Sequence, residues 1–191
     1  MELTAENVKG EKTKYRLAQS MKECMKTTTV DNITVKQITE NCGLTRQTFY
    51  PNFMDKFDLI NWYFDKLLAK SFEHMGMGKT VYDALVKKFT YIQEEHIFFA
   101  AAFKYDRQNS LRQHDFELIL AFYSDRIQEK SRKPLSEDLK FLLEMYCQGS
   151  IYMTVQWVFG RVKRTPEELA ADLVKAMPEE LAGGFERLDL L

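Results

Sequence analysis

A rapid succession of helix starts and stops between Thr34 and Asp55 constrains the fold of this chain more than any other feature of its sequence. Thr34 is followed three residues later by Gln37, a capping-box pattern that starts a helix near Val35. Gly43 then ends this helix, because glycine adopts the left-handed conformation of a helix end without strain. A short helix closed by a glycine turn is therefore expected here.

A second short helix follows the glycine turn, with Thr45 in the position to cap it. It must be brief, because Pro51 lacks the backbone N–H that a continuing helix needs. A further cap at Asp55 starts a long amphipathic helix that is expected to run from Lys56 to about His74. The two short helices and their turn are predicted to form a helix-turn-helix, in which the second helix enters the major groove of DNA.

The rest of the chain also has helical periodicity, with no convincing strand alternation, and only 8 glycines and 4 prolines interrupt it. The expected fold class is all-α, with about nine helices. The DNA-binding domain is expected at residues 1–54, and a helical ligand-sensing and dimerisation domain at residues 55–191. The later helices are expected at Val81–Glu94, from His96, at 110–130, at Glu137–Gly160, and from Pro166 to the Gly183–Gly184 pair.

Charge and motif content narrow the class of function. Nine basic residues against five acidic ones lie between Lys9 and Lys56, whereas the whole chain has a net charge of -1, and such asymmetry favours a nucleic-acid partner. The three cysteines are too widely spaced for a disulfide framework or a zinc site. No stretch is apolar enough to span a membrane, so a cytoplasmic protein is expected. No catalytic or phosphate-loop motif is present, so no enzyme activity, cofactor or metal is expected.

The helix-turn-helix carries side chains suited to reading DNA. Arginine can bond guanine through two hydrogen bonds, glutamine can bond adenine, and threonine can contact the methyl group of thymine. A tyrosine hydroxyl or a cation at a helix N-terminus suits a phosphate. The residues expected to bind DNA are Thr34, Thr45, Arg46, Gln47, Thr48, Tyr50 and Lys56.

The run GLTRQTFYPNF, preceded by Ile-Thr-Val and followed by Asp-Lys-x-x-Leu, resembles the signature of the TetR/AcrR family of transcriptional regulators. The resemblance spans about Lys12 to Trp62. It implies an all-helical homodimer in which residues 45–48 face bases or nearby phosphates, while Tyr50, Lys56 and Thr34 face the DNA backbone. The run around 91–103 is similar to the subgroup that includes regulators of dihydroxyacetone-kinase operons.

Two further residue sets in the C-terminal part are candidates for a site. Aromatic and methionine side chains with a few polar tips are typical of plain core or of a small-molecule cavity. The candidate pocket residues are His96, Phe99, Phe103, Phe122, Tyr123, Tyr152, Met153 and Trp157. The helix at Glu137–Gly160 carries more apolar surface than one neighbour can cover, and the last helix carries an apolar stripe, so the two favour a four-helix dimer interface. Its expected residues are Leu139, Leu143, Tyr146, Leu169, Leu173 and Met177.

These features predict a ligand-responsive repressor that binds a palindromic, double-stranded operator as a homodimer and has no membrane partner. Two alternatives remain open at this point. One is a helical regulator controlled by a protein partner, and the other is an activator; neither needs a small-molecule effector. A closed cavity in the C-terminal domain would favour the effector, and its absence would favour a protein partner.

Overall fold

The computed structural model describes residues 5–73, 79–104 and 111–191. In these ranges the chain forms ten α-helices and one short 3-10 helix, which confirms the all-α expectation. Two compact units divide the chain: unit 1 is residues 1–66 and 97–111, and unit 2 is residues 67–96 and 112–191. The expected domain boundary after residue 54 precedes α4 (Lys56–Phe72), whereas the division between the units falls inside this helix.

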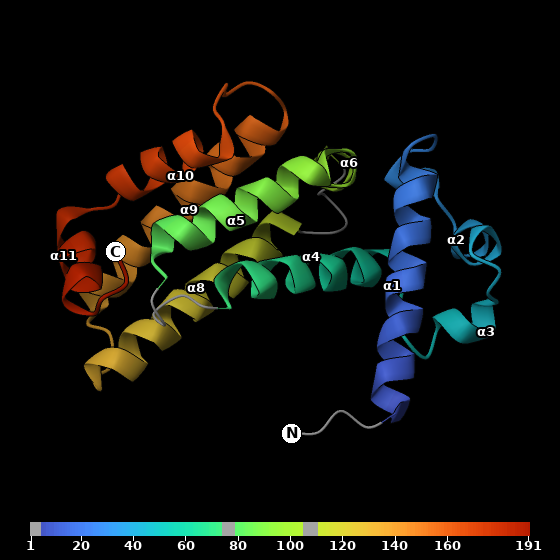
Figure 1. Cartoon of the computed structure of the whole chain (residues 1–191), viewed down its shortest axis with the longest axis horizontal. Coiled ribbons are helices and arrows are strands. Elements are labelled where there is room, and N and C mark those ends of the chain that lie inside the picture. The colour runs from blue at the N-terminus through green and yellow to red at the C-terminus, as the bar shows by residue number, and fades with distance from the viewer. Residues whose placement is uncertain (1–4, 74–78, 105–110) are drawn as a thin grey trace. The chain divides into compact units, whose positions relative to one another are not determined.

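Unit 1 holds the N-terminal helices around a small apolar core. Its elements are α1 (Ala5–Met25), η1 (Val30–Asn32), α2 (Val35–Asn41), α3 (Arg46–Phe49), the first part of α4 and most of α6 (His96–Lys104). Leu17 and Met21 of α1 are fully buried, as are Ile38 of α2 and Phe49 of α3. This burial fixes α1 against α2, and α2 against α3 (Figure 1).

Unit 2 is a helical bundle with aromatic contacts in its core. Besides the end of α4 it contains α5 (Val81–Glu94), α8 (Leu111–Ser131), α9 (Glu137–Val158), α10 (Pro166–Lys175) and α11 (Glu179–Arg187). α5 packs along α10, as Figure 1 shows, and α11 packs against α9. Tyr123 of α8 is buried with its ring centroid 5.5 Å from that of Phe185 in α11.

The last predicted helix is wrong in its extent, because the segment after Pro166 forms two helices rather than one. α10 ends at Lys175, and α11 begins after Pro178. Proline has no N–H to donate and disfavours the helical conformation in the residue before it, so it separates the two helices. Gly183 and Gly184 lie inside α11, and neither has a positive φ, so they do not end the helix.

Candidate DNA-binding surface and sensor unit

The capping box predicted at the start of α2 is confirmed. The Thr34 hydroxyl accepts a hydrogen bond from the backbone N–H of Gln37 at 3.2 Å, and the Gln37 side-chain oxygen accepts one from the backbone N–H of Thr34 at 2.8 Å. At the other end of α2, Gly43 has φ +63°, and the N–H of Leu44 donates to the Thr39 carbonyl at 2.8 Å. Glycine is needed there, because a side chain is strained at positive φ. The helix-turn-helix geometry thus follows from local sequence.

The second helix of this motif, α3, is a single turn. Thr45 lies at its N-cap, but its hydroxyl makes no capping bond and instead lies 3.2 Å from the Thr48 hydroxyl, so the predicted side-chain cap is wrong. α3 ends at Phe49, two residues before Pro51, in agreement with the expected early stop. Buried Phe49 holds the turn in place, and the Asn52 amide donates to the Thr48 carbonyl at 2.7 Å.

The side chains predicted to read bases lie on the outside of this turn. Arg46 and Gln47 are exposed, and Thr48 is half-buried. Exposed Thr34 and Thr45 flank them, and the Tyr50 side chain is 57% exposed beside buried Phe49. Polar groups that face water at the end of a short, anchored helix can exchange that water for base edges. The base-reading role of these residues remains a prediction.

Lys56, predicted to meet a DNA phosphate, has contacts within unit 1. Its half-buried ammonium donates to the carbonyl oxygens of Asp31 at 2.7 Å and Ile33 at 2.8 Å, and burial lowers its pKa. The Asp55 carboxylate accepts from the N–H groups of Phe57 and Asp58, which confirms the predicted cap of α4. Two of the three ammonium donors of Lys56 and two amides at the start of α4 are therefore already bonded within the chain.

Arg16, an exposed cation near the turn, is not among the residues that the sequence predicts to bind DNA. An added Cβ at Gly43 would lie 3.4 Å from the Nη2 atom of Arg16, so the Arg16 guanidinium of α1 lies over the helix-turn-helix turn. The excess of basic residues up to Lys56 includes Arg16, but spacing along the chain does not reveal which helix face meets the turn. That placement depends on how α1 packs.

The predicted pocket residues fall into both units. Phe99 and Phe103 are buried in unit 1, whereas the others belong to unit 2. Tyr152 and Met153 are 62% and 37% exposed on α9, so they face away from the core of unit 2. Exposed His96 has its Nε2 atom 2.8 Å from the Val158 carbonyl. Of the predicted pocket residues in unit 2, Tyr123 is buried, and Phe122 and Trp157 are half-buried.

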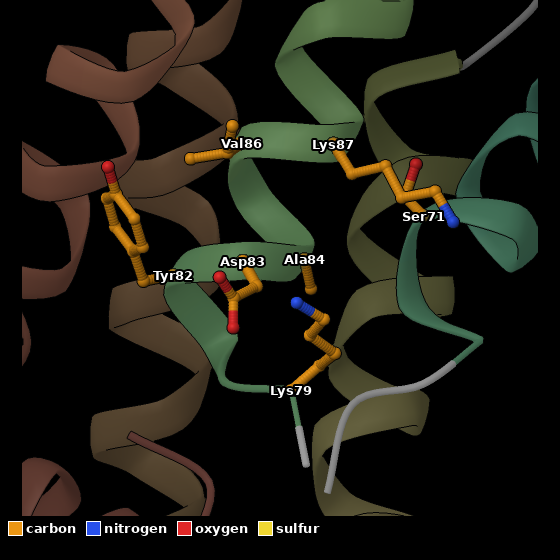
Figure 2. Close-up of a pocket in the computed structure, with 7 residues that line it drawn as sticks. All are labelled: Ser71, Lys79, Tyr82, Asp83, Ala84, Val86 and Lys87. Atoms are coloured by element: carbon orange, nitrogen blue, oxygen red, sulfur yellow. The ribbon is translucent and has the colours of Figure 1, made fainter. Parts of the chain in front are cut away.

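Unit 2 has a pocket of about 330 Å³ beside the start of α5 that is partly open to solvent rather than closed, and none of the predicted pocket residues lines it. Figure 2 shows the lining residues, which are Ser71, Lys79, Tyr82, Asp83, Ala84, Val86 and Lys87. The Asp83 carboxylate accepts from the N–H and hydroxyl of Thr80, as part of a capping box. The lining contains two lysines but only one carboxylate, and that carboxylate is already bonded to the start of α5. The pocket lining therefore has a surplus of positive charge.

An ion pair lies in the core of unit 2. The Lys88 ammonium is 3.1 Å from one Asp115 carboxylate oxygen and 3.3 Å from the other, and the side chains are 4% and 0% exposed. Burial raises the pKa of Asp115, an effect that Lys88 opposes. Burial also raises the pKa of Cys147 to about 12, so this thiol stays protonated. No three His, Cys, Asp or Glu side chains among the described residues are placed to hold a metal ion.

The six predicted dimer residues lie mostly inside their own unit. Leu139 is half-buried; the buried ones are Leu143, Tyr146, Leu169, Leu173 and Met177. The Tyr146 hydroxyl donates to the Leu173 carbonyl at 3.2 Å and so joins α9 to α10 of the same subunit. On its outer face α9 exposes other apolar side chains, which are Phe141 at 64%, Met145 at 61%, Tyr152 at 62% and Met153 at 37%. None of the described helices is long and apolar enough to span a bilayer.

Similarity to known proteins extends over most of the chain. Residues 79–179, more than half of its length, match a TetR family model described as "Transcriptional regulator C-terminal region". Comparison with curated protein sequences finds no match. Among solved structures, the dihydroxyacetone kinase operon activator DhaS shares 18% identity over 88% of this chain and 96% of its own, with a TM-score of 0.61. NalD, the secondary repressor of the MexAB-OprM multidrug efflux pump in Pseudomonas aeruginosa, shares 16% identity over 88% and 95%, with a TM-score of 0.55.

Proposed function

The chain belongs to the TetR family of transcriptional regulators, and from this premise we propose that it is a cytoplasmic repressor that binds a palindromic operator as a homodimer. The observation that carries the proposal is the helix-turn-helix of unit 1, which exposes Arg46 and Gln47 on a turn anchored by buried Phe49. A small-molecule effector bound in unit 2 shifts the population toward a dimer whose reading helices no longer match the operator.

The shortness of α3 supports the proposed dimer. A single helical turn reaches too few base edges to specify a site, whereas two copies read half-sites about 34–36 Å apart or a multiple of that distance. The exposed face of α9 gives the second copy a place to bind. Phe141, Met145 and Tyr152 follow one another at helical spacing, with exposed Gly149 between them. A large exposed apolar patch of this kind marks an interaction surface.

The direction of regulation has a second candidate. DhaS, which shares this fold, is named an operon activator, whereas NalD is named a repressor. The alternative function is therefore that of a transcriptional activator. Such an activator can respond to a protein partner instead of a small-molecule effector. Transcription from a promoter that carries the selected operator decides between them, because deletion of a repressor raises transcription and deletion of an activator lowers it.

Arg46→Ala is expected to weaken operator binding by about 1–3 kcal/mol and to relax the preference at one base of each half-site, because an arginine–guanine pair is lost. The measurement is selection from a random duplex library, followed by fluorescence anisotropy on the selected site. Lys140→Ala is a matched control, because it removes an exposed cation from unit 2. Failure of the unaltered protein to enrich any sequence would refute the proposed reading surface.

The pocket beside α5 is the proposed effector site, and its volume is near the lower end of the range for small-molecule sites, about 300–1,000 Å³. Its surplus of lysine predicts that amphipathic carboxylates raise the melting temperature, because a ligand that binds only the folded state stabilises it. Lys87→Met should abolish this rise, whereas Lys163→Met, which removes an exposed cation from the segment before α10, should retain it. A panel of aromatic carboxylates that leaves the melting temperature unchanged would contradict this assignment.

A further inference from the structure

Arg16 of α1 lies beside the predicted reading surface although α1 is not one of the two helices of the helix-turn-helix. Its guanidinium lies 3.4 Å from the position of an added Cβ at Gly43, and Gly43 is only two residues before Thr45. Two residues of extended chain span at most about 7 Å. The Arg16 cation therefore lies within a short distance of the N-terminus of α3.

Packing fixes the backbone from which Arg16 projects. Neighbouring Leu17 is fully buried, and one turn further on the Ser20 hydroxyl donates to the Ile38 carbonyl at 2.6 Å. The Asn41 amide in turn donates to the Ser20 hydroxyl at 2.9 Å. These two hydrogen bonds join α1 to the end of α2 that leads into the turn. The position of Arg16 relative to α3 is thus held by buried contacts.

The chemistry of Arg16 suits a phosphate. Its side chain is exposed and makes no ion pair among the described residues. Guanidinium presents five N–H donors in a planar fork that matches two phosphate oxygens. Lys56, by contrast, already donates to two carbonyl oxygens of its own unit. Arg16 is therefore better placed than Lys56 to supply a positive charge at the DNA backbone.

We propose that Arg16 binds a backbone phosphate next to each operator half-site and so positions α3 in the major groove. The contact comes from outside the helix-turn-helix and rests on the proposed reading surface around Arg46. A phosphate contact fixes orientation without carrying sequence information.

The test is the salt dependence of operator affinity for Arg16→Ala. Each phosphate contact contributes about 0.9 to the slope of log K against log salt concentration, so loss of one contact per subunit should lower the slope of a dimer by about two. The sequence selected from a random library should stay the same. Arg16→Lys should restore part of the slope, because it retains the charge but not the planar fork.

Lys26→Ala is the matched control, because it removes one exposed cation from the same chain segment. It lies ten residues further on, about 15 Å away along a helical path, and its ammonium pairs with Glu23 at 2.8 Å. An equal slope for Arg16→Ala and Lys26→Ala would overturn the proposal, because the loss of one positive charge anywhere in this segment would then explain the effect. An unchanged slope for Arg16→Ala would also overturn it, whereas failure of Arg46→Ala to alter binding would contradict the reading surface itself.

Discussion

Met145→Glu is expected to convert the protein from a dimer to a monomer and to lower operator affinity toward that for random DNA. Met145 is 61% exposed in the middle of the outer face of α9, so the glutamate causes no clash within the subunit. In a dimer that buries this face, however, the two-fold axis brings an uncompensated charge from each subunit into the interface. Specific sites bind about 10³–10⁷-fold more tightly than random DNA, and a monomer loses most of that difference.

Analytical ultracentrifugation measures the change in assembly, and circular dichroism checks that helical content is retained. Ala121→Glu is the control, because it adds the same charge at an exposed position of α8 and should leave a dimer. Leu173→Glu should behave differently from both, because Leu173 is only 5% exposed within its own subunit and the charge would unfold unit 2. A dimer of unchanged stability for Met145→Glu would place the interface elsewhere.

Lys88→Met is expected to lower the free energy of unfolding by about 3–5 kcal/mol, because removal of one partner leaves the other charge of a buried pair without compensation. The Asp115 carboxylate is fully buried and would lose the ammonium that lies 3.1 Å from one of its oxygens. Chemical denaturation, followed by circular dichroism, measures this loss. The double variant Lys88→Met with Asp115→Leu should recover much of it, because neither charge then has to be desolvated.

The pH dependence of the same variant gives an independent check. Burial already raises the pKa of Asp115, and loss of Lys88 removes an effect that lowers it. The folded variant then binds a proton more tightly than the unfolded chain does, so its stability falls as the pH rises through the interval between the two pKa values. The deficit relative to the unaltered protein should shrink as the pH falls toward the ordinary pKa of aspartate, about 3.9. A deficit that is independent of pH would contradict a charge-based cause.

The local features of the DNA-binding motif were predictable because they depend on neighbouring residues. A capping box needs only Thr34 and Gln37, and the turn needs only a residue that tolerates positive φ at Gly43. The end of α3 before Pro51 follows from a missing N–H. Each of these effects acts over one turn of helix, so the sequence contains it directly. The same reasoning missed the break at Pro178, where two later glycines were a misleading signal for the helix end.

The partners of side chains were not predictable, because they depend on which elements pack together. Lys56 has the sequence context of a phosphate ligand, but folding brings its ammonium against carbonyl oxygens about twenty-five residues earlier in the chain. Arg16 has no motif of its own and is placed over Gly43 only by the packing of α1 on α2. Similarly, the pair of Lys88 and Asp115 joins two helices whose sequences do not indicate it.

α9 is a helix whose buried face could not be identified from the sequence. The sequence predicts a long helix here, and the Ser136 hydroxyl caps its start, but apolar side chains lie on both sides of the helix. Periodicity cannot distinguish a side that faces the subunit core from one that faces outward, because both satisfy the same spacing. Only the tertiary structure turns Leu143 and Tyr146 inward and leaves Phe141 and Met145 exposed. The sequence by itself thus determined most of the helices and the helix-turn-helix, whereas packing decided which apolar face of α9 stays exposed.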